Sequence, residues 1–392
     1  MAKTSKKSTI RLADCDEFVR LAKIACESSS RFEDSLVDYD LERCCREALD
    51  KLDDSDIEAA LAELKNDAGP AYDELLAIAE DCAETIDRPG DVHLLVLIPI
   101  LAWSRYRIRF GEIESTPLVA IANAYREYFA SPSAKVTMGN CLISAEHIPE
   151  QLYKVRMLLN KLIASGNGHG SIVDVRDLLT GAPPADFSDT RYLVAVVSAS
   201  SATELFHSRS ETYEERARAC MNFCMQCHNA LAMTMIGSVF DVQPPAAFFS
   251  AWRQSETAMR VYALKSLVSF VECMGFSADQ LIVTTAIFTR PVQSDTEPNT
   301  ELRIGVSLKK KPDATIAGIV WPVLDDDVEQ TQTLAGEILS SCAVTNLIAL
   351  DQTFPMEWCE DCGAPVYATP NGLVTHIEAP DEDATEFAPT LN

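Results

Sequence analysis

The sequence predicts an α+β protein: an irregular helical N-terminal domain followed by a mostly antiparallel α+β domain that ends in a Cys-x-x-Cys hairpin. In the first part of the chain, apolar residues recur every three or four positions, which is the period of amphipathic helices. Past residue 189, short β-branched runs alternate with turn-rich stretches, which is typical of strands. The 392 residues, 47% hydrophobic and 23% charged, are too many for a single core, so two globular units are expected.

Residues 1–164 are expected to form the helical domain. Gly69-Pro70 ends one helix and begins the next, and the absence of a fixed repeat length favours an irregular bundle over a solenoid. The run from Val92 to Trp103 is the most apolar, but about a dozen residues fall short of the roughly 20 needed to cross a bilayer, so it is interpreted as buried core. The stripes that predict helices span residues 12–26, 41–52, 57–64, 75–86, 118–128 and 152–162.

Two glycine-rich stretches, 165–170 and 181–186, mark a linker at 165–188. The α+β domain follows at 189–355 with the predicted order β-α-α-β-β-β-α-β, which suggests helices on one face of an antiparallel sheet, as in a ferredoxin-like arrangement. Residues 380–392 form an acidic tail without apolar period, which predicts disorder. The predicted strands of the domain span residues 192–197, 281–289, 301–308, 315–323 and 345–350.

Charge and cysteine content restrict the partners and the compartment. The 59 acidic and 33 basic residues give a formal net charge of −26, which repels phosphate backbones, so no direct contact with nucleic acid is expected. The basic start, residues 1–10, lacks the apolar core of an export signal, and no membrane association is expected. The odd number of cysteines, 13, argues against a disulfide framework. A cytoplasmic location with reduced thiols is therefore expected.

Residues 356–379 carry the strongest chemical signal and predict a zinc-ribbon-like hairpin. Cys359 and Cys362 can both point into one turn and bind a metal ion, and Gly363 lets the backbone turn its N–H groups toward the sulfur atoms. Zinc is the cofactor that this pattern favours. A hairpin without metal and a redox dithiol are the alternatives.

A structural zinc site needs four ligands, and the two cysteines supply only two. Asn371-Gly372 predicts a two-residue hairpin turn. His376 is the third candidate, although pairing outward from this turn sets it opposite Tyr367 and roughly 15 Å from Cys362, at about 3.3 Å per residue, unless the chain bends at Pro365. Cys342 is a fourth candidate. A second copy of the chain could instead supply the missing pair, which leaves a homo-oligomer open.

A second cysteine motif, Cys224-Met-Gln-Cys227-His228, matches the attachment pattern of c-type haem. With Cys220 it forms a stripe at helical spacing on an apolar face, in a chain without an export signal. Packing in the core is the better interpretation, and no haem is expected.

The segment after the apolar run alternates arginines with apolar or aromatic residues: Trp103, Arg105, Arg107 and Arg109 form this arginine ladder. In an extended chain the three guanidinium groups would share a face, where they could hold carboxylates or phosphates through paired hydrogen bonds. The alternative is that they pair with nearby glutamates of the same chain.

Three stretches of the chain are distinctive: residues 99–106; residues 303–306 with 318–323; and residues 354–365, with the Cys-x-Asp-Cys-Gly-Ala-Pro motif, continuing to His376. In these stretches the chain resembles a family of bacterial, chiefly proteobacterial, proteins known only as a domain of unknown function. The resemblance implies a cytosolic protein and attaches no activity to it. Because Arg107 and Arg109 depart from the less basic residues of the family, Arg105 alone would carry over as an anion ligand.

Two functional hypotheses follow. The first is a non-enzymatic binding or regulatory protein in which Cys359 and Cys362 bind a metal ion or close the C-terminal domain as a clasp. The alternative is an enzyme whose anionic small-molecule substrate is held near Arg105 at the domain interface.

Overall fold

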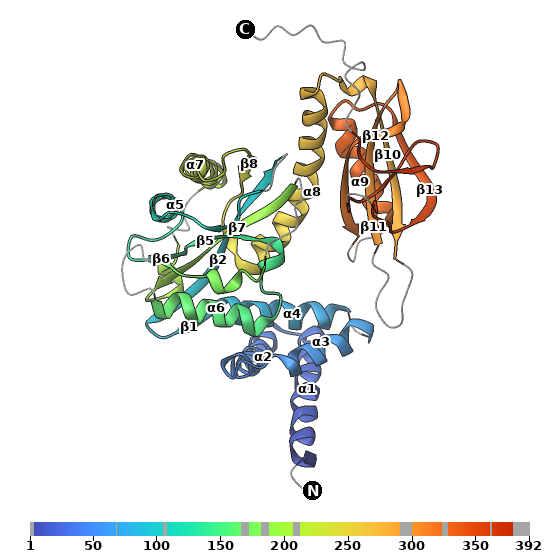
Figure 1. The fold of residues 1–392 in the computed structure, drawn as a ribbon. Helices are drawn as coiled ribbons and strands as arrows, with labels where there is room; N and C mark the ends of the chain where they lie inside the picture. Colours follow the sequence, from blue (N-terminus) through green and yellow to red (C-terminus); the bar gives the residue numbers. More distant parts are fainter. Residues whose placement is uncertain are drawn as a thin grey trace. The chain divides into compact units, whose positions relative to one another are not determined.

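The computed structural model describes residues 4–67, 69–104, 108–165, 172–181, 188–206, 212–290, 300–323, 328–360 and 363–378. The chain forms two compact units, Met1–Glu256 and Thr257–Asn392, and each contains helices and a sheet (Figure 1). The predicted α+β class is therefore confirmed. None of the helices in these described ranges has the length and apolar content needed to span a membrane.

The chain begins with four helices: α1 (Thr4–Glu27), α2 (Arg31–Asp50), α3 (Ser55–Asp67) and α4 (Gly69–Glu84). The side chain of Ser30 caps α2 by accepting a hydrogen bond from the N–H of Glu33. The buried residues of α2 follow the helical period and are Val37, Leu41, Cys45 and Leu49.

The sheet of the first unit is built on β2 (Asp91–Trp103) and β7 (Ser188–Ala199), which pair antiparallel from Val92 opposite Ala199 to Trp103 opposite Ser188. The main path of the sheet is β1-β2-β7-β4-β6. Its other strands are β1 (Thr85–Arg88), β3 (Gly111–Glu112), β4 (Lys135–Gly139), β5 (Cys141–Ser144), β6 (Ile172–Val173), β8 (Val239–Val242) and β9 (Ala246–Ala247).

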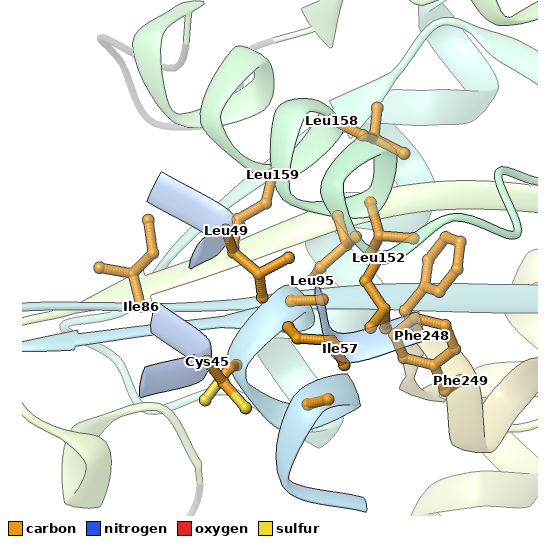
Figure 2. Packing of buried hydrophobic residues seen from close by; sticks show 14 of the residues in the cluster. Cys45, Leu49, Ile57, Ile86, Leu95, Leu152, Leu158, Leu159, Phe248 and Phe249 are labelled. Carbon is orange, nitrogen blue, oxygen red and sulfur yellow. The ribbon is translucent and has the colours of Figure 1, made fainter. Parts of the chain in front are cut away.

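Both faces of this sheet are covered. Successive residues of β2 alternate between two cores, with Leu95 in the core beneath α1–α4 and α6 (Leu152–Ser165), and Val96 in the core beneath α5 (Ser115–Tyr128) and α7 (Tyr213–Leu231). Figure 2 shows Leu95 among Leu49, Ile57 and Leu152 of the first core.

The structure differs from the predicted domain division. The predicted helical domain, 1–164, contains β2, and the predicted first strand of the second domain lies in β7, so one sheet joins the two sides of the 165–188 linker. The division falls between Glu256 and Thr257, inside α8 (Phe248–Cys273). The physical reason is that β2 is buried on both faces, so its sequence lacks the period of two that marks a strand. The predicted tail, 380–392, lies outside the described residues.

The second unit contains a four-stranded sheet in the order β12-β11-β10-β13. Strands β10 (Leu281–Thr289), β11 (Thr300–Leu308) and β12 (Lys311–Val323) form an antiparallel meander. Helix α9 (Val328–Ser341) then leads to β13 (Leu347–Pro355), which pairs parallel to β10. This β-β-β-α-β order differs from the β-α-β-β-α-β order of a ferredoxin-like fold. Short 3₁₀ helices elsewhere in the chain span Ala145–His147, Arg176–Leu178, Ala202–Glu204 and Ala278–Gln280.

Glu84, the last residue of α4, is an acidic side chain in the core of the first unit. It is 7% exposed, and its Oε2 accepts a 2.9 Å hydrogen bond from the N–H of Phe249 in the first turn of α8. Burial above all, with Asp81 and Glu80 nearby, raises the pKa of Glu84 from 4.5 to about 7, although the Phe249 N–H and Arg253 act in the opposite direction. Between about pH 4.5 and about pH 7, Glu84 therefore keeps its proton in the folded protein and loses it in the unfolded chain.

We predict that Glu84→Gln stabilises the protein at about pH 8 and leaves it nearly unchanged at about pH 4. Because the folded-state pKa is raised, the stabilisation from protonated Glu84 is complete below the unfolded pKa and is lost as pH rises through about 7. At roughly 1.4 kcal/mol per unit, the loss approaches about 3 kcal/mol. Urea unfolding at the two pH values measures it, with exposed Glu63→Gln as control. A pH dependence in Glu84→Gln equal to that of the wild type would contradict the prediction.

Candidate metal centre

The C-terminal hairpin of the second unit consists of β14 (Tyr367–Ala368) and β15 (Val374–Thr375). Tyr367 lies opposite Thr375, and the predicted turn contains Gly372 with a positive φ of 76°. The sequence analysis placed His376 opposite Tyr367, whereas the turn is one residue longer than the predicted two-residue loop. His376 therefore lies one position further toward the cysteine motif.

The segment around Cys359 folds back on itself and brings this thiol to His376. A bridge between Trp358 and Pro365 closes the loop, and within it the N–H of Cys359 donates to the carbonyl of Ala364 at 2.8 Å. Gly363 adopts a φ of 69°, which favours glycine, and its N–H donates to the carbonyl of Cys359 at 2.8 Å. The chain therefore bends at Pro365, as is required for His376 to come close to the cysteine motif.

The Sγ atom of Cys359 lies 3.2 Å from Nδ1 of His376, although the two residues are 17 positions apart. Two such ligands on one tetrahedral zinc ion, with Zn–S and Zn–N bonds of about 2.3 and 2.05 Å, would lie about 3.6 Å apart. The other ring nitrogen, Nε2, lies 3.7 Å from the carboxylate of Glu378. A carboxylate on the far ring nitrogen is the usual partner of a histidine that binds a metal ion.

Cys362, the second predicted cysteine ligand, lies outside the described residues. Among the residues that the structure does describe, no group of three or more His, Cys, Asp or Glu side chains is arranged to hold a metal ion. Cys342 packs against the core that contains Ile287, whereas the hairpin residue Ala368 packs with Phe288 on the other face of the sheet. The sheet therefore separates Cys342 from the hairpin, which excludes it as a ligand of the same site.

Tyr367 seats the hairpin on the sheet, and two glycines make room for its side chain. A Cβ atom at Gly318 would lie 2.5 Å from a ring carbon of Tyr367, and one at Gly305 would lie 3.2 Å from the Tyr367 Cβ. After the hairpin, Ile377 pairs with Thr315 of β12, and the N–H of Glu378 donates to the Thr315 carbonyl at 2.8 Å. Both ends of the hairpin are thus attached to the sheet.

Arg303, in β11, is 1% exposed and contacts both ends of the cysteine loop, which is the segment closed by the bridge between Trp358 and Pro365. Its Nη1 donates to the carbonyls of Glu357 and Val366, at 2.7 and 2.8 Å, which flank the loop. Its Nε donates to Glu301 at 2.9 Å, and its Nη2 lies 2.8 Å from the same carboxylate oxygen without hydrogen-bond alignment. The guanidinium also lies 4.4 Å from the ring centre of Phe288. The sequence analysis did not single out Arg303, because a single arginine in an apolar run gives no signal of its burial.

The arginine ladder lies in the first unit. Trp103 ends β2 and pairs with Ser188 and Val239, whereas Arg105 and Arg107 lie outside the described residues. Arg109 is exposed, and its guanidinium donates to the carbonyl of Glu112 at 3.1 Å. The anion site predicted on the ladder therefore stays a prediction.

The cysteines of the haem-like motif pack in the core, as the sequence analysis expected. Cys227 is fully buried in α7, and half-buried Cys224 packs against the same core. Burial raises the pKa of Cys224 to about 12 and also raises the pKa of Cys227, so both remain protonated thiols at neutral pH. The ring of His228 stacks on Phe240 with a centroid separation of 4.2 Å.

We predict that Gly318→Ala destabilises the second unit by about 1–3 kcal/mol, because the new methyl group overlaps the ring of Tyr367. The same substitution should have little effect in a Tyr367→Ala background, since the overlapping ring is then gone. Gly336→Ala in α9 is the matched control, because a Cβ atom there meets nothing within 4 Å. Urea unfolding of the four variants measures the coupling. Additive effects of Gly318→Ala and Tyr367→Ala would show that overlap with the Tyr367 ring is not the cause of the destabilisation.

We also predict that Arg303→Met destabilises the second unit by roughly 3–5 kcal/mol, since it leaves the half-buried carboxylate of Glu301 without its cation and two carbonyls without their donor. Replacing both members, as Arg303→Met with Glu301→Leu, should recover part of the loss because no charge is then left unpaired. Chemical denaturation measures both, with the exposed Lys309→Met as control. A loss no larger than that of the control would show that the cation does not hold the loop.

Comparison with known proteins places nearly the whole chain in one family. A sequence model described as "Protein of unknown function (DUF2863)" matches residues 3–389, which include both the arginine ladder and the cysteine hairpin. No curated protein and no solved structure matches the chain. The chain therefore belongs to the DUF2863 family of proteins of unknown function.

Proposed function

We propose that this protein is a non-enzymatic binding or regulatory protein of the cytoplasm whose C-terminal hairpin holds one zinc ion through Cys359, Cys362 and His376. The observation that carries the proposal is the 3.2 Å approach of the Cys359 thiol to Nδ1 of His376. The zinc ion would act as a clasp that ties the cysteine loop to the outgoing end of the hairpin.

The chemistry of the donors favours zinc over other ions. Sulfur and imidazole nitrogen are ligands of Zn²⁺, whereas Mg²⁺ and Ca²⁺ take oxygen. Glu378, beside the far nitrogen of His376, would fix the ring so that Nδ1 faces the ion. A fourth ligand would come from water or from a partner.

The clasp also suits the architecture around it. The loop and the end of the hairpin are attached to the sheet separately, the first by Arg303 and the second by Thr315. An ion bound between them would add a direct link between two attachments that are otherwise joined through the paired strands of the hairpin. A reducing compartment suits the cysteines, since the twelve in the described residues form no disulfide.

The test is the metal content of the purified protein. We expect about one zinc ion per chain by mass spectrometry of the metal, lost in Cys359→Ser and in His376→Ala. Cys342→Ser is the matched control, because this thiol lies on the other face of the sheet. At free zinc about a hundredfold above its Kd, the ion should stabilise the second unit by about 2.7 kcal/mol, seen as a lower Tm after chelation.

The outcomes separate the proposal from its alternatives. Metal-free protein in which Cys359 and Cys362 oxidise reversibly to a disulfide would identify a redox pair. Metal-free protein without that disulfide, and with a Cys359→Ser variant of unchanged Tm, would leave a hairpin that needs no ion. Either result would refute the zinc clasp.

A further inference from the structure

A cavity of about 590 Å³ opens in the first unit, far along the chain from the hairpin. Its floor is the surface of β2 at Leu94 and Val96, beside the short strand β9. Its walls come from α5, from α7 and from the first turns of α8. Sites for small molecules commonly have about 300–1,000 Å³, so this cavity has the size of a binding site.

The wall on α5 is aromatic. Tyr125 and Phe129 line the cavity, and their ring centres lie 5.5 Å apart. Phe223 of α7 supports both from behind, at 5.1 Å from Phe129 and 6.2 Å from Tyr125. Burial raises the pKa of Tyr125, so its hydroxyl stays neutral. The wall is thus a packed apolar surface that suits the body of an organic ligand.

Apart from the hydroxyls of Tyr125 and Tyr128, the polar groups among the described lining residues come in two pairs, each one helical turn apart. Arg216 and Cys220 project from α7, and Ser250 and Gln254 from α8, so each pair shares a helix face. Among the described residues that line the cavity, one is a cation and none carries a carboxylate. In a chain with a net charge of −26, such a lining is selective for an anion.

Arg216 is available to a ligand. Among the residues that the structure describes, its guanidinium has no acidic partner. The adjacent acid, Glu215, is engaged elsewhere: it accepts from the N–H and the hydroxyl of Thr212, at 2.8 and 3.0 Å, in the cap of α7. A guanidinium presents two parallel N–H groups that match a carboxylate.

We propose that this cavity binds a small organic carboxylate with an aromatic or aliphatic body. The body lies on Val96 and the aromatic wall, and the carboxylate pairs with Arg216 at the rim. Gln254 and Ser250 supply hydrogen bonds from α8. The site does not involve the zinc hairpin, and its test succeeds or fails independently of the proposed clasp.

The experiment measures displacement of the fluorescent anion anilinonaphthalene sulfonate from the full-length protein by phenylacetate, phenylbutyrate, octanoate and dodecanoate. We expect saturable competition by at least one of them, weakened about tenfold or more in Arg216→Gln, since a hydrogen bond between charged groups contributes about that factor. Arg218→Gln, an exposed arginine two residues along the same helix and outside the cavity, should leave the affinity unchanged.

Two further measurements distinguish this site from general apolar binding. The alcohol that corresponds to the best carboxylate should bind wild type and Arg216→Gln equally, because it lacks the charge. Ala219→Trp, which fills the cavity from α7, should abolish binding of both compounds in a variant whose Tm shows that it is folded. Absence of saturable competition by any of the four acids, or equal affinities in Arg216→Gln and Arg218→Gln, would overturn the proposal.

Discussion

The arrangement of the candidate metal centre depends on a buried positive charge. Arg303 is 1% exposed, and a guanidinium in such a place is tolerated only when its donors are paired. The carboxylate of Glu301 and the carbonyls of Glu357 and Val366 supply most of that pairing. Because the two carbonyls flank the cysteine loop, the loop cannot move away without leaving the cation without partners. The charge of Arg303 and the hydrogen bonds that it donates therefore fix the position of Cys359.

A buried arginine also holds a segment of the first unit through its backbone carbonyls. Arg191, also 1% exposed, donates to the carbonyls of Arg109 and Ile108 and pairs with the carboxylate of Asp189. Burial raises the pKa of Asp189, and the nearby Arg191 partly offsets that rise. The end of the arginine ladder is therefore held through its backbone by an arginine from β7. The guanidinium of Arg109 itself points to an exposed contact with Glu112.

Periodicity in the sequence was sufficient to predict the N-terminal helices, and glycine and proline positions predicted the cysteine loop and the hairpin turn. The pairing of β2 with β7 could not be predicted, because a strand buried on both faces shows no alternation. The turn length of the hairpin, on which the position of His376 depends, also has no local signature. Arg191 and Arg303 escaped notice because burial of an arginine depends on partners that lie far away in the sequence. The cavity beside Arg216 has walls from α5, α7 and α8, and no local pattern reports their convergence.

The stretches that carry the family resemblance also indicate how the ligands of the proposed metal site are positioned. Arg303 and Gly318 come from one of these stretches and Pro365 from another, yet all three lie where the hairpin is attached to the sheet. This attachment consists of backbone hydrogen bonds, the ion pair of Arg303 and a packed tyrosine ring, none of which involves the side chain of a metal ligand. Cys359 and His376 are therefore brought together by the fold itself. In small zinc fingers the ion supplies most of the folding free energy. Here an ion would bind to a preformed pair of ligands, so it would add stability to a unit that already has its own core.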